Sequence, residues 1–482
     1  MNWLIVWIVV YLLLIVFLAL RHLRTSDFEQ YLVNNRNTKT LPLVFTMLAT
    51  LVGGGTSIAL MALGYESGFA AVAIGIGYVI GFMLLIRFAG RIRSYGAKHN
   101  IYSFPHYLNH KFTSANEPTF SRVFSATVSG VNVFIFFFIL CAQFVAMASL
   151  LKFSFEIGYN TAAIISAIII ILYTAIAGLS GVIITDSIQF IAIVIMIIVI
   201  FIPGIMADTD SFSRLSELPA EMLNGTELGL GFLIGTMLFL PWSVLVRMDV
   251  WQRILAAKSE KIAKKVSFWS GMGMLPFYFI FPLVGMAMKI ILDYDLDEKE
   301  SADVAYLFIN RHSGGFIMAF AVVGLLSALM SSGDSFLNII SISAVKDFVG
   351  WGKKKGQVSK EKAHQMIRIS TIIFGVVALF IALVFPNIVD LMVVGISTIT
   401  IFAPITILAL VSKNAFAYRK AALSSILVAF VINLVLFSWG IIFPDQFQAK
   451  TSFVPSFILG TVVLLIGVKL TRVNPDAAKK EV

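Results

Sequence analysis

The 482-residue sequence is poor in charge and nearly devoid of cysteine. Charged residues make up 13% of the chain, against about 25% in soluble globular domains. Hydrophobic residues make up 59%, and the mean hydropathy is +0.92. This composition excludes a water-soluble globule and indicates an all-α polytopic membrane protein.

The scarcity of reactive side chains narrows the function. The single cysteine, Cys141, excludes an intramolecular disulfide and a cysteine-based metal site, and we interpret it as a small buried apolar residue. Most of the six histidines lie in loops, as do His106 and His110. Without a Walker motif or paired catalytic acids, an enzyme or an ATP-driven pump is not expected. The net charge of +10 follows membrane topology and requires no nucleic-acid partner.

Apolar runs of about 20 residues, the length of a membrane-spanning helix, recur along the chain. Roughly thirteen spans lie near residues 2–21, 41–64, 69–90, 124–151, 159–178, 181–205, 228–249, 266–291, 313–343, 369–386, 388–412, 418–443 and 453–471. The first lacks a basic n-region and a cleavage site, so we expect it to be retained as a helix. Residues 1–482 are therefore interpreted as a single transmembrane domain.

Basic and acidic residues alternate between the loops. Basic residues follow the odd-numbered spans: Arg21, Arg24, Arg36 and Lys39; Arg87, Arg91, Arg93 and Lys98; Arg253, Lys258, Lys261, Lys264 and Lys265; and Lys353, Lys354 and Lys355. Acidic residues mark alternate loops: Asp208, Asp210, Glu217 and Glu221, and Asp293, Asp295, Asp297 and Glu298. The positive-inside rule then predicts a cell-membrane protein with its N-terminus outside and its C-terminus in the cytoplasm.

Two spans carry interruptions. The second contains Gly53, Gly54 and Gly55 in succession, and each glycine costs about 1 kcal/mol of helix propensity relative to alanine. Close helix packing is the alternative explanation, but it needs glycine on one face only, so we favour an unwound segment. The seventh span contains Pro241, which frees a carbonyl one turn earlier. Because these spans are five apart, spans 2–6 (roughly 41–205) and 7–11 (roughly 228–412) are interpreted as 5+5 inverted repeats, flanked by 2–21, 418–443 and 453–471.

A polar cluster lies inside the ninth span. Ser331, Ser332, Asp334 and Ser335 follow one another closely within hydrocarbon. An unpaired polar group in lipid costs several kcal/mol, so the cluster needs internal partners or a ligand. Oxygen donors without sulfur or imidazole suit a hard cation.

Four local patterns, in order along the chain, resemble the sodium/solute symporter family. They are Ala49-Thr-Leu-Val52-Gly-Gly-Gly-Thr56; Ala177-Gly-Leu-Ser-Gly181 followed by Thr185-Asp186-Ser187-Ile188-Gln189; Gln252-Arg253-Ile-Leu-Ala-Ala-Lys258; and Met330-Ser331-Ser332-Gly-Asp334-Ser335. The resemblance implies the inverted-repeat fold of the bacterial leucine transporter and Na+ as coupling ion. By position, it implies a sodium site formed by the carbonyls of Ala49, Val52 and Ala328 and the hydroxyls of Ser331 and Ser332. The alternative for both serines is a hydrogen bond back to the preceding turn of their own helix.

Asp186 occupies the position at which the family places an aspartate near the sodium pathway. In some members this aspartate and further serines form a second sodium site, whereas here Asp334-Ser335 follows the serine pair. Asp334 is then either a stronger ligand or a structural hydrogen-bond partner near the helix end. We favour one coupled sodium, with Asp186 shaping the field around it; the alternative is an acid that caps Thr185 or the adjacent loop.

The resemblance says less about the identity of the transported solute. By position, Thr56, Gly54, Phe239, Trp242, Ser243 and Val244 face the substrate. Sugar carriers of the family place amides and a tyrosine near these positions, so a sugar is disfavoured. Arg247 either reaches a substrate carboxylate, or extends to the interface or pairs with Asp249. We favour a small organic solute such as a monocarboxylate or an amino acid.

We therefore predict a monomeric sodium-coupled symporter that imports a small solute across the lipid bilayer by alternating access. Proton coupling through Asp186 or Asp334 is the main alternative. A passive channel would need a continuous polar pore, and a membrane sensor would need an appended signalling domain, whereas about ten polar residues follow the last span.

Overall fold

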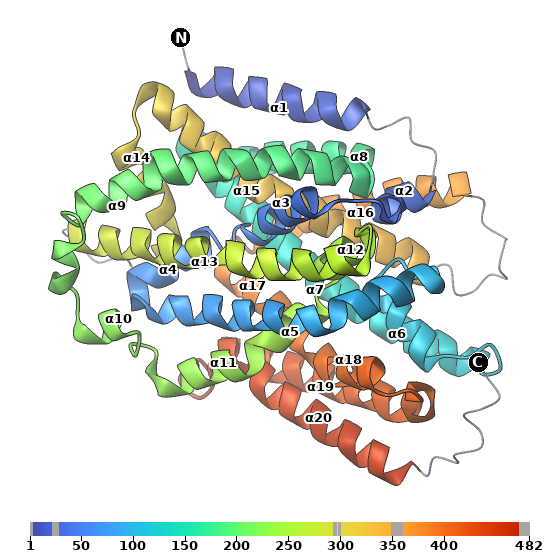
Figure 1. The fold of residues 1–482 in the computed structure, drawn as a ribbon. Coiled ribbons are helices and arrows are strands. Elements are labelled where there is room, and N and C mark those ends of the chain that lie inside the picture. The colour runs from blue at the N-terminus through green and yellow to red at the C-terminus, as the bar shows by residue number, and fades with distance from the viewer. Residues whose placement is uncertain (1–2, 22–27, 293–295, 297–299, 349–359, 472–482) are drawn as a thin grey trace.

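The computed structural model describes residues 3–21, 28–292, 296, 300–348 and 360–471. Within these ranges the chain is helical, and its single isolated β-bridge joins Thr38 to Ala257. Ten helices are long and apolar enough to cross a membrane, and Trp3–Leu18, Thr40–Leu51 and Tyr159–Ala175 are shorter apolar helices. The helices run roughly alongside one another, and this indicates a multi-pass membrane protein (Figure 1).

Helices cover the residues predicted as spans. The long apolar helices include α5 (Ala70–Lys98), α7 (Pro118–Phe155), α8 (Tyr159–Met196), α11 (Gly229–Val246), α13 (Glu260–Ile291), α15 (Gly315–Ile342), α16 (Lys360–Val384), α19 (Arg419–Ile442) and α20 (Phe453–Leu470). The shorter apolar helix Trp3–Leu18 belongs to α1 (Trp3–Arg21). The span predicted at 388–412 consists of α17 (Ile388–Ile399), the 3-10 turn Thr400–Phe402 and α18 (Ala403–Val411). Hydrophobic patterning alone therefore located the apolar helices, although several extend beyond the predicted bounds, as α5 and α16 do.

The second predicted span is broken, as the glycine triplet predicted. It consists of α3 (Thr40–Leu51) and α4 (Ile58–Ser67), with residues 52–57 in turns between them. The amide groups of Thr56 and Ser57 both donate to the Gly53 carbonyl, at 2.9 Å each. Carbonyl groups at the end of α3 are consequently left for other partners.

The seventh predicted span is also broken, but not at Pro241. α11 continues through Pro241 and ends at Val246, and α12 (Met248–Ala256) begins after Arg247, whose backbone is extended. A proline removes one donor, and a helix tolerates this when other groups satisfy the freed carbonyl. The helix is interrupted completely at Arg247. The Trp251 indole N–H stabilises this interruption, because it donates to the Leu245 carbonyl at 2.7 Å.

The fifth and sixth predicted spans fall within α8, the π-helical turn Ile197–Phe201 and α9 (Ile202–Asp208). The hydroxyls of Tyr173 and Thr185 are hydrogen bonded to each other although they are twelve positions apart. A straight helix rises about 1.5 Å per residue and would hold these positions roughly 18 Å apart. The chain therefore bends sharply between Tyr173 and Thr185, as two separate spans require.

Shorter helices complete the described structure. They are α2 (Phe28–Val33), α6 (Phe104–Phe112), α10 (Ala220–Asn224) and α14 (Val304–His312), with 3-10 turns at Asn34–Arg36, Ser213–Glu217, Ser301–Asp303, Ala415–Tyr418 and Ala449–Thr451, and a π-helical turn at Ser343–Phe348. Arg24, Lys353, Lys354, Lys355, Asp293, Asp295, Asp297 and Glu298, which entered the topology prediction, lie outside the described residues.

α15 lies at the centre of the bundle. It packs against α7, α8, α3 and α1, and its residues from Ala321 to Ile342 are buried. α19 and α20 pack on each other at one side of the molecule (Figure 1) and expose large apolar side chains such as Val431 and Leu465. Exposed apolar residues on outer helices are expected where helices face lipid. The polar cluster of the ninth span is thus held at the centre, away from this face.

Candidate cation site

The serine pair of α15 contacts the end of α3. Ser331 Oγ lies 2.8 Å from the Ala49 carbonyl oxygen, and Ser332 Oγ lies 2.8 Å from the Thr50 carbonyl oxygen. Both hydroxyls also approach the Ala328 carbonyl, at 3.1 Å and 3.2 Å. Both serines are fully buried. The predicted hydrogen bond back to the preceding turn is therefore present, and each hydroxyl also faces the broken span, where sodium ligation stays a prediction.

Four of the five predicted sodium ligands are brought together. Ala49, Ala328, Ser331 and Ser332 converge, whereas no contact between Val52 and the serines is among the described hydrogen bonds. The Thr50 carbonyl takes part instead. Carbonyl and hydroxyl oxygens form an uncharged donor set for a hard cation. Among the described residues, no group of three His, Cys, Asp or Glu side chains could hold a metal ion.

Gly53 makes this close contact between α3 and α15 sterically feasible. A Cβ atom at position 53 would lie 2.1 Å from Ser332 Oγ and 2.8 Å from Gln143 Oε1. Neither approach is compatible with a real Cβ atom. The glycine is therefore needed for proximity between backbone and side chain, in addition to the unwinding that the sequence suggested.

Gln143 on α7 is a residue of this site that the sequence analysis missed. Its Oε1 accepts a hydrogen bond from the Gly54 amide at 2.8 Å, and its Nε2 donates to the Ile139 carbonyl at 3.4 Å. Gln143 is 1% exposed. An amide within a long apolar helix was a signal that could have identified it, since buried polar groups need partners.

A second group of polar side chains lies beside the serine pair. Asp186 Oδ2 accepts hydrogen bonds from the hydroxyls of Thr46 and Thr50 on α3, and Arg253 Nη2 lies 3.4 Å from the same oxygen. Arg253 and Asp186 are both fully buried. The predicted alternative for Asp186, a cap on Thr185 or the adjacent loop, is not what the contacts show: this carboxylate bridges α8 to α3 and α12.

The structure places Ser335 in this second group. Its Oγ lies 3.2 Å from Thr50 Oγ1 and 2.8 Å from Arg253 Nη2. Asp334 is fully buried, and neither of its carboxylate oxygens has a hydrogen-bond partner among the described residues. α15 continues to Ile342, so Asp334 is not near a helix end. The predicted location of Asp334 near a helix terminus is therefore wrong, whereas its role as a ligand or as a structural hydrogen-bond partner stays a prediction.

Arg253 departs most from the sequence interpretation, which counted it in a basic cytoplasmic loop. The break at Arg247 starts a new helix, α12, and α12 carries Arg253 into the interior. Its partners Asp186, Thr46 and Thr50 are 67, 207 and 203 positions away. The neighbouring Gln252 was a signal, because a Gln-Arg pair directly after a membrane span is polar enough to need buried partners.

The predicted substrate residues are distributed over different surroundings. Thr56, in the unwound segment, is half-buried and neighbours the Tyr278 side chain of α13. Tyr278 stacks on Tyr78 of α5, with ring centroids 5.9 Å apart and an interplanar angle of 6°. Ser243 is buried and donates to the Leu240 carbonyl at 2.7 Å. Tyr278, which the sequence analysis did not select, is thus next to Thr56, and Tyr78 stacks on it.

Phe239 is not brought together with these residues. It packs edge-to-face against Phe453 and Phe457 of α20. Trp242 is half-buried, and its indole N–H donates to the Leu238 carbonyl of its own helix at 3.0 Å. Val244 is buried against α5, where its Cγ2 would lie 2.7 Å from a Cβ atom at position 81. The α11 face that contains Phe239 therefore points towards a peripheral helix.

Arg247 pairs with Asp249, which was one of its predicted alternatives. Nη2 lies 2.6 Å from Asp249 Oδ2, and Nε lies 3.0 Å from Oδ1, with both side chains buried. Such a bidentate pair between the residue at the break and the first turn of α12 holds the break in one geometry. In this arrangement the guanidinium is already neutralised.

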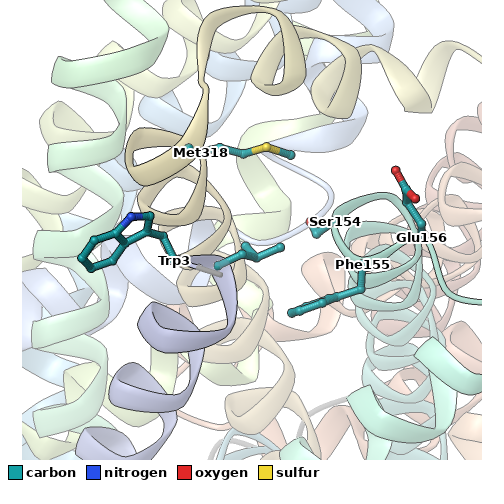
Figure 2. A pocket seen from close by; sticks show the side chains of 7 residues that line it. Trp3, Ser154, Phe155, Glu156 and Met318 are labelled. Atoms are coloured by element: carbon teal, nitrogen blue, oxygen red, sulfur yellow. The ribbon is translucent and has the colours of Figure 1, made fainter. Parts of the chain in front are cut away.

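A cavity of about 430 Å³ is lined by residues other than those of the candidate cation site. Trp3 and Leu4 of α1, Ser154 and Phe155 of α7, Glu156, Gly315 and Met318 line it (Figure 2). None of the predicted ligands or substrate residues is among these. The candidate cation site is instead closely packed, with its oxygen atoms in mutual contact.

The sequence is similar to those of known sodium-coupled transporters. The model of the sodium:solute symporter family matches residues 31–429. A sodium/proline symporter of Staphylococcus aureus is 24% identical over 489 residues, covering 97% of this chain and 92% of the relative. A second, from Staphylococcus aureus strain bovine RF122 / ET3-1, is 24% identical over 469 residues, covering 93% of this chain and 88% of the relative.

Solved structures show the same fold. A Na+-coupled sialic acid symporter in a substrate-bound outward-open state superimposes with a TM-score of 0.76 at 16% identity, covering 98% of both chains. A nucleobase-cation-symport-1 family transporter in a closed conformation gives a TM-score of 0.58 at 13% identity, covering 91% of this chain and 93% of that one. Together with the match over residues 31–429, these findings show that the chain belongs to the sodium:solute symporter family and uses Na+ as its coupling ion.

Proposed function

We propose that this symporter imports a small carboxylate-bearing solute together with Na+ by alternating access between two inverted five-helix repeats. The observation that carries the proposal is the contact of Ser331 and Ser332 with the carbonyl ends of α3. A hydroxyl pair facing free backbone carbonyls can exchange its hydrogen bonds for a cation held between the same oxygens. Such an ion ties α3 to α15, so its binding favours the state in which the two helices are close.

An amino acid is our first candidate for the solute, with L-proline as the first compound to test. The curated relatives are named sodium/proline symporters. The first turn of α4 follows the unwound segment directly, and a helix N-terminus favours a negatively charged group. Thr56, Tyr78 and Tyr278 add hydroxyl groups and aromatic surface beside it, which suits a compact solute with an apolar ring.

Arg247 supports a solute of no net charge in preference to a simple anion. Its guanidinium is paired with Asp249 at 2.6 Å and is buried. A solute carboxylate would have to displace Asp249 and leave that carboxylate buried and unpaired, at a cost of several kcal/mol. The helix end and the sodium ion then remain as the positive charges available to the solute carboxylate. A monocarboxylate without an amino group is the second candidate.

The end of the molecule that carries Arg36 and Arg93 is assigned to the cytoplasm, and it is closed. The Thr38 amide donates to the Ala256 carbonyl at 3.1 Å, and the Lys258 amide donates to the Thr38 carbonyl at 3.0 Å. Arg93 Nε donates to the Ala257 carbonyl. The segment before α3 is thus bound to the segment after α12, and release to the cytoplasm requires these bonds to open.

The driving force follows from charge movement. One elementary charge moved through 100 mV contributes about 2.3 kcal/mol, equivalent to roughly fiftyfold accumulation of the solute. The sodium concentration gradient adds to this. Each of the proposed steps moves an ion, a solute or a helix, and none of them makes or breaks a covalent bond.

The proposal is tested with purified protein in liposomes. Uptake of labelled L-proline, other amino acids and monocarboxylates is measured with an inward Na+ gradient, with a proton gradient alone, and with neither. Accumulation of one of these solutes that requires Na+ supports the proposal. Full uptake with protons in the absence of Na+ would instead establish the proton-coupled alternative.

A further inference from the structure

A single nitrogen atom of Arg253 lies where four side-chain oxygens from three helices converge. Nη2 is 2.8 Å from Thr50 Oγ1 and from Ser335 Oγ, 3.2 Å from Thr46 Oγ1 and 3.4 Å from Asp186 Oδ2. The oxygens belong to α3, α8 and α15, whereas Arg253 belongs to α12. All five side chains are buried.

The number of oxygens exceeds what this nitrogen can satisfy by hydrogen bonding. Nη2 carries two hydrogens, and its two contacts at 2.8 Å account for both. Thr46 and Asp186 lie farther from Nη2, at 3.2 Å and 3.4 Å, and the Thr46 hydroxyl donates to Asp186 Oδ2. Hydroxyl groups and a carboxylate around one point form the donor set that a free hard cation prefers.

The guanidinium is a permanent monovalent cation, because arginine does not lose its proton in proteins. We propose that Arg253 is a tethered cation that fills a second cation site, so that the protein binds a single free Na+ per cycle. This inference rests on the proposed sodium site at Ser331 and Ser332, and it assigns a separate role to the neighbouring four oxygens.

The balance of charge supports this assignment. Two carboxylates, Asp186 and Asp334, are buried in this part of the molecule, and one arginine accompanies them. The Arg253 guanidinium lies 3.4 Å from Asp186 Oδ2 and balances the charge of that carboxylate without a second Na+. A second Na+ would then have no charge on Asp186 left to balance, and the Arg253 nitrogen already contacts the oxygens of Thr50 and Ser335. Removing the guanidinium would reverse both conditions.

The position of Arg253 on α12 gives the tethered cation a mobility that no fixed ligand has. α12 is bound beyond its C-terminal end by the Thr38 and Arg93 contacts, so opening of that end displaces α12. Displacement of α12 withdraws the cation from Thr50 and Ser335. The second site is then filled in the closed state and is vacated by the motion that opens the protein.

The test counts sodium ions and compares two serines that lie four residues apart. Binding of ²²Na+ to the purified protein gives the number of ions per transporter, the half-saturating concentration and the Hill coefficient. The wild-type protein is expected to bind one ion with a Hill coefficient near one. Ser331→Ala is expected to raise the half-saturating concentration about tenfold or more, whereas Ser335→Ala leaves it within about twofold, because Ser335 binds the arginine.

The Arg253→Gln variant tests whether the second cation site accepts a free Na+ once the guanidinium is removed. It is expected to bind two ions with a Hill coefficient approaching two, and the double variant with Asp186→Asn is expected to return to one. Arg419→Gln is the matched control. Arg419 begins the peripheral helix α19 and is paired with Glu117, so this variant also loses a paired arginine but should still bind one ion.

The outcomes separate this inference from the proposed function. A rise in half-saturating Na+ for Ser331→Ala alone supports both. An equal rise for Ser335→Ala keeps the sodium site and overturns the tethered cation. Two ions bound by the wild-type protein, or one ion with an unchanged Hill coefficient in folded Arg253→Gln, also overturn it. The comparison of Ser335→Ala with Ser331→Ala tests the tethered cation even if Arg253→Gln does not fold.

Discussion

The Ser331 hydroxyl of α15 lies 2.8 Å from the Ala49 carbonyl oxygen, which is in the last turn of α3, next to the break in that span. This contact joins a continuous helix to an interrupted one. An ion between them would replace a direct hydrogen bond, so the same atoms serve the sodium-bound and sodium-free states.

Removing either hydroxyl should weaken sodium binding. We expect Ser331→Ala and Ser332→Ala each to raise the sodium concentration for half-maximal uptake about tenfold, since loss of about 1.4 kcal/mol corresponds to that factor. Uptake of labelled solute at increasing Na+ measures the effect. Ser327→Ala is the control, because its hydroxyl donates to the Val323 carbonyl of its own helix at 2.8 Å. Unchanged sodium dependence in both variants would refute the site.

Adding one methyl group at position 53 should disturb the same site. The Cβ atom of Gly53→Ala would fall 2.1 Å from Ser332 Oγ, so the serine has to move. We expect uptake to fall at least tenfold at low Na+ and to recover in part at high Na+. Gly235→Ala, where no atom lies within 4 Å of the added Cβ, should retain wild-type uptake. Equal effects at both glycines would indicate a general folding defect.

Gln143 should affect the solute step through the unwound segment. Gln143→Leu leaves the Gly54 amide without the acceptor that now lies 2.8 Å away, and an unsatisfied buried amide costs about 1–3 kcal/mol. We expect the uptake rate to drop and the apparent solute affinity to fall, whereas Gln143→Glu, which keeps an acceptor oxygen, should be less impaired. The KM and the maximal rate of uptake are measured for both. Equal kinetics in the two variants would show that the acceptor is unimportant.

Arg93 should control access at the end that carries the basic residues. Its Nε donates to the Ala257 carbonyl and its Nη2 lies 3.3 Å from the Lys258 carbonyl. In an Ala257→Cys background, Arg93→Ala is expected to speed maleimide labelling at position 257, because the closed contact loses two charge-assisted bonds. The natural cysteine, Cys141, is buried and contributes little background. A labelling rate that Arg93→Ala does not change would argue that the backbone bridge at Thr38 closes this end alone.

The fold was largely predictable because its signals are local. Runs of apolar residues mark the helices, and the triplet at Gly53 marks the first break, since each depends only on neighbouring residues. The second break was misplaced at Pro241, because what ends the helix is the capping of the Leu245 carbonyl by Trp251, and that contact depends on how α12 folds back.

The candidate site was predictable only in part, for a related reason. The serine pair and Ala49 were found because they lie in recognisable local patterns. Arg253 was assigned to a loop because its sequence neighbours include lysines, whereas its burial is decided by Asp186, 67 positions earlier in the chain. Gln143 and Thr46 are polar residues on apolar helices, and only tertiary packing chooses their partners.

Thr50 belongs to both groups of oxygens: its carbonyl accepts from Ser332, and its hydroxyl lies 2.8 Å from Arg253 Nη2. Two ligands that share one residue influence each other reciprocally, and to the same extent in each direction. If Na+ at the serines stabilises Thr50 in this position, it also strengthens the hold on Arg253 and keeps α12 in place. Conversely, departure of α12 lowers the affinity for Na+. Ion release and opening of the protein are then coupled through a single threonine, and no further element is needed to order the two steps.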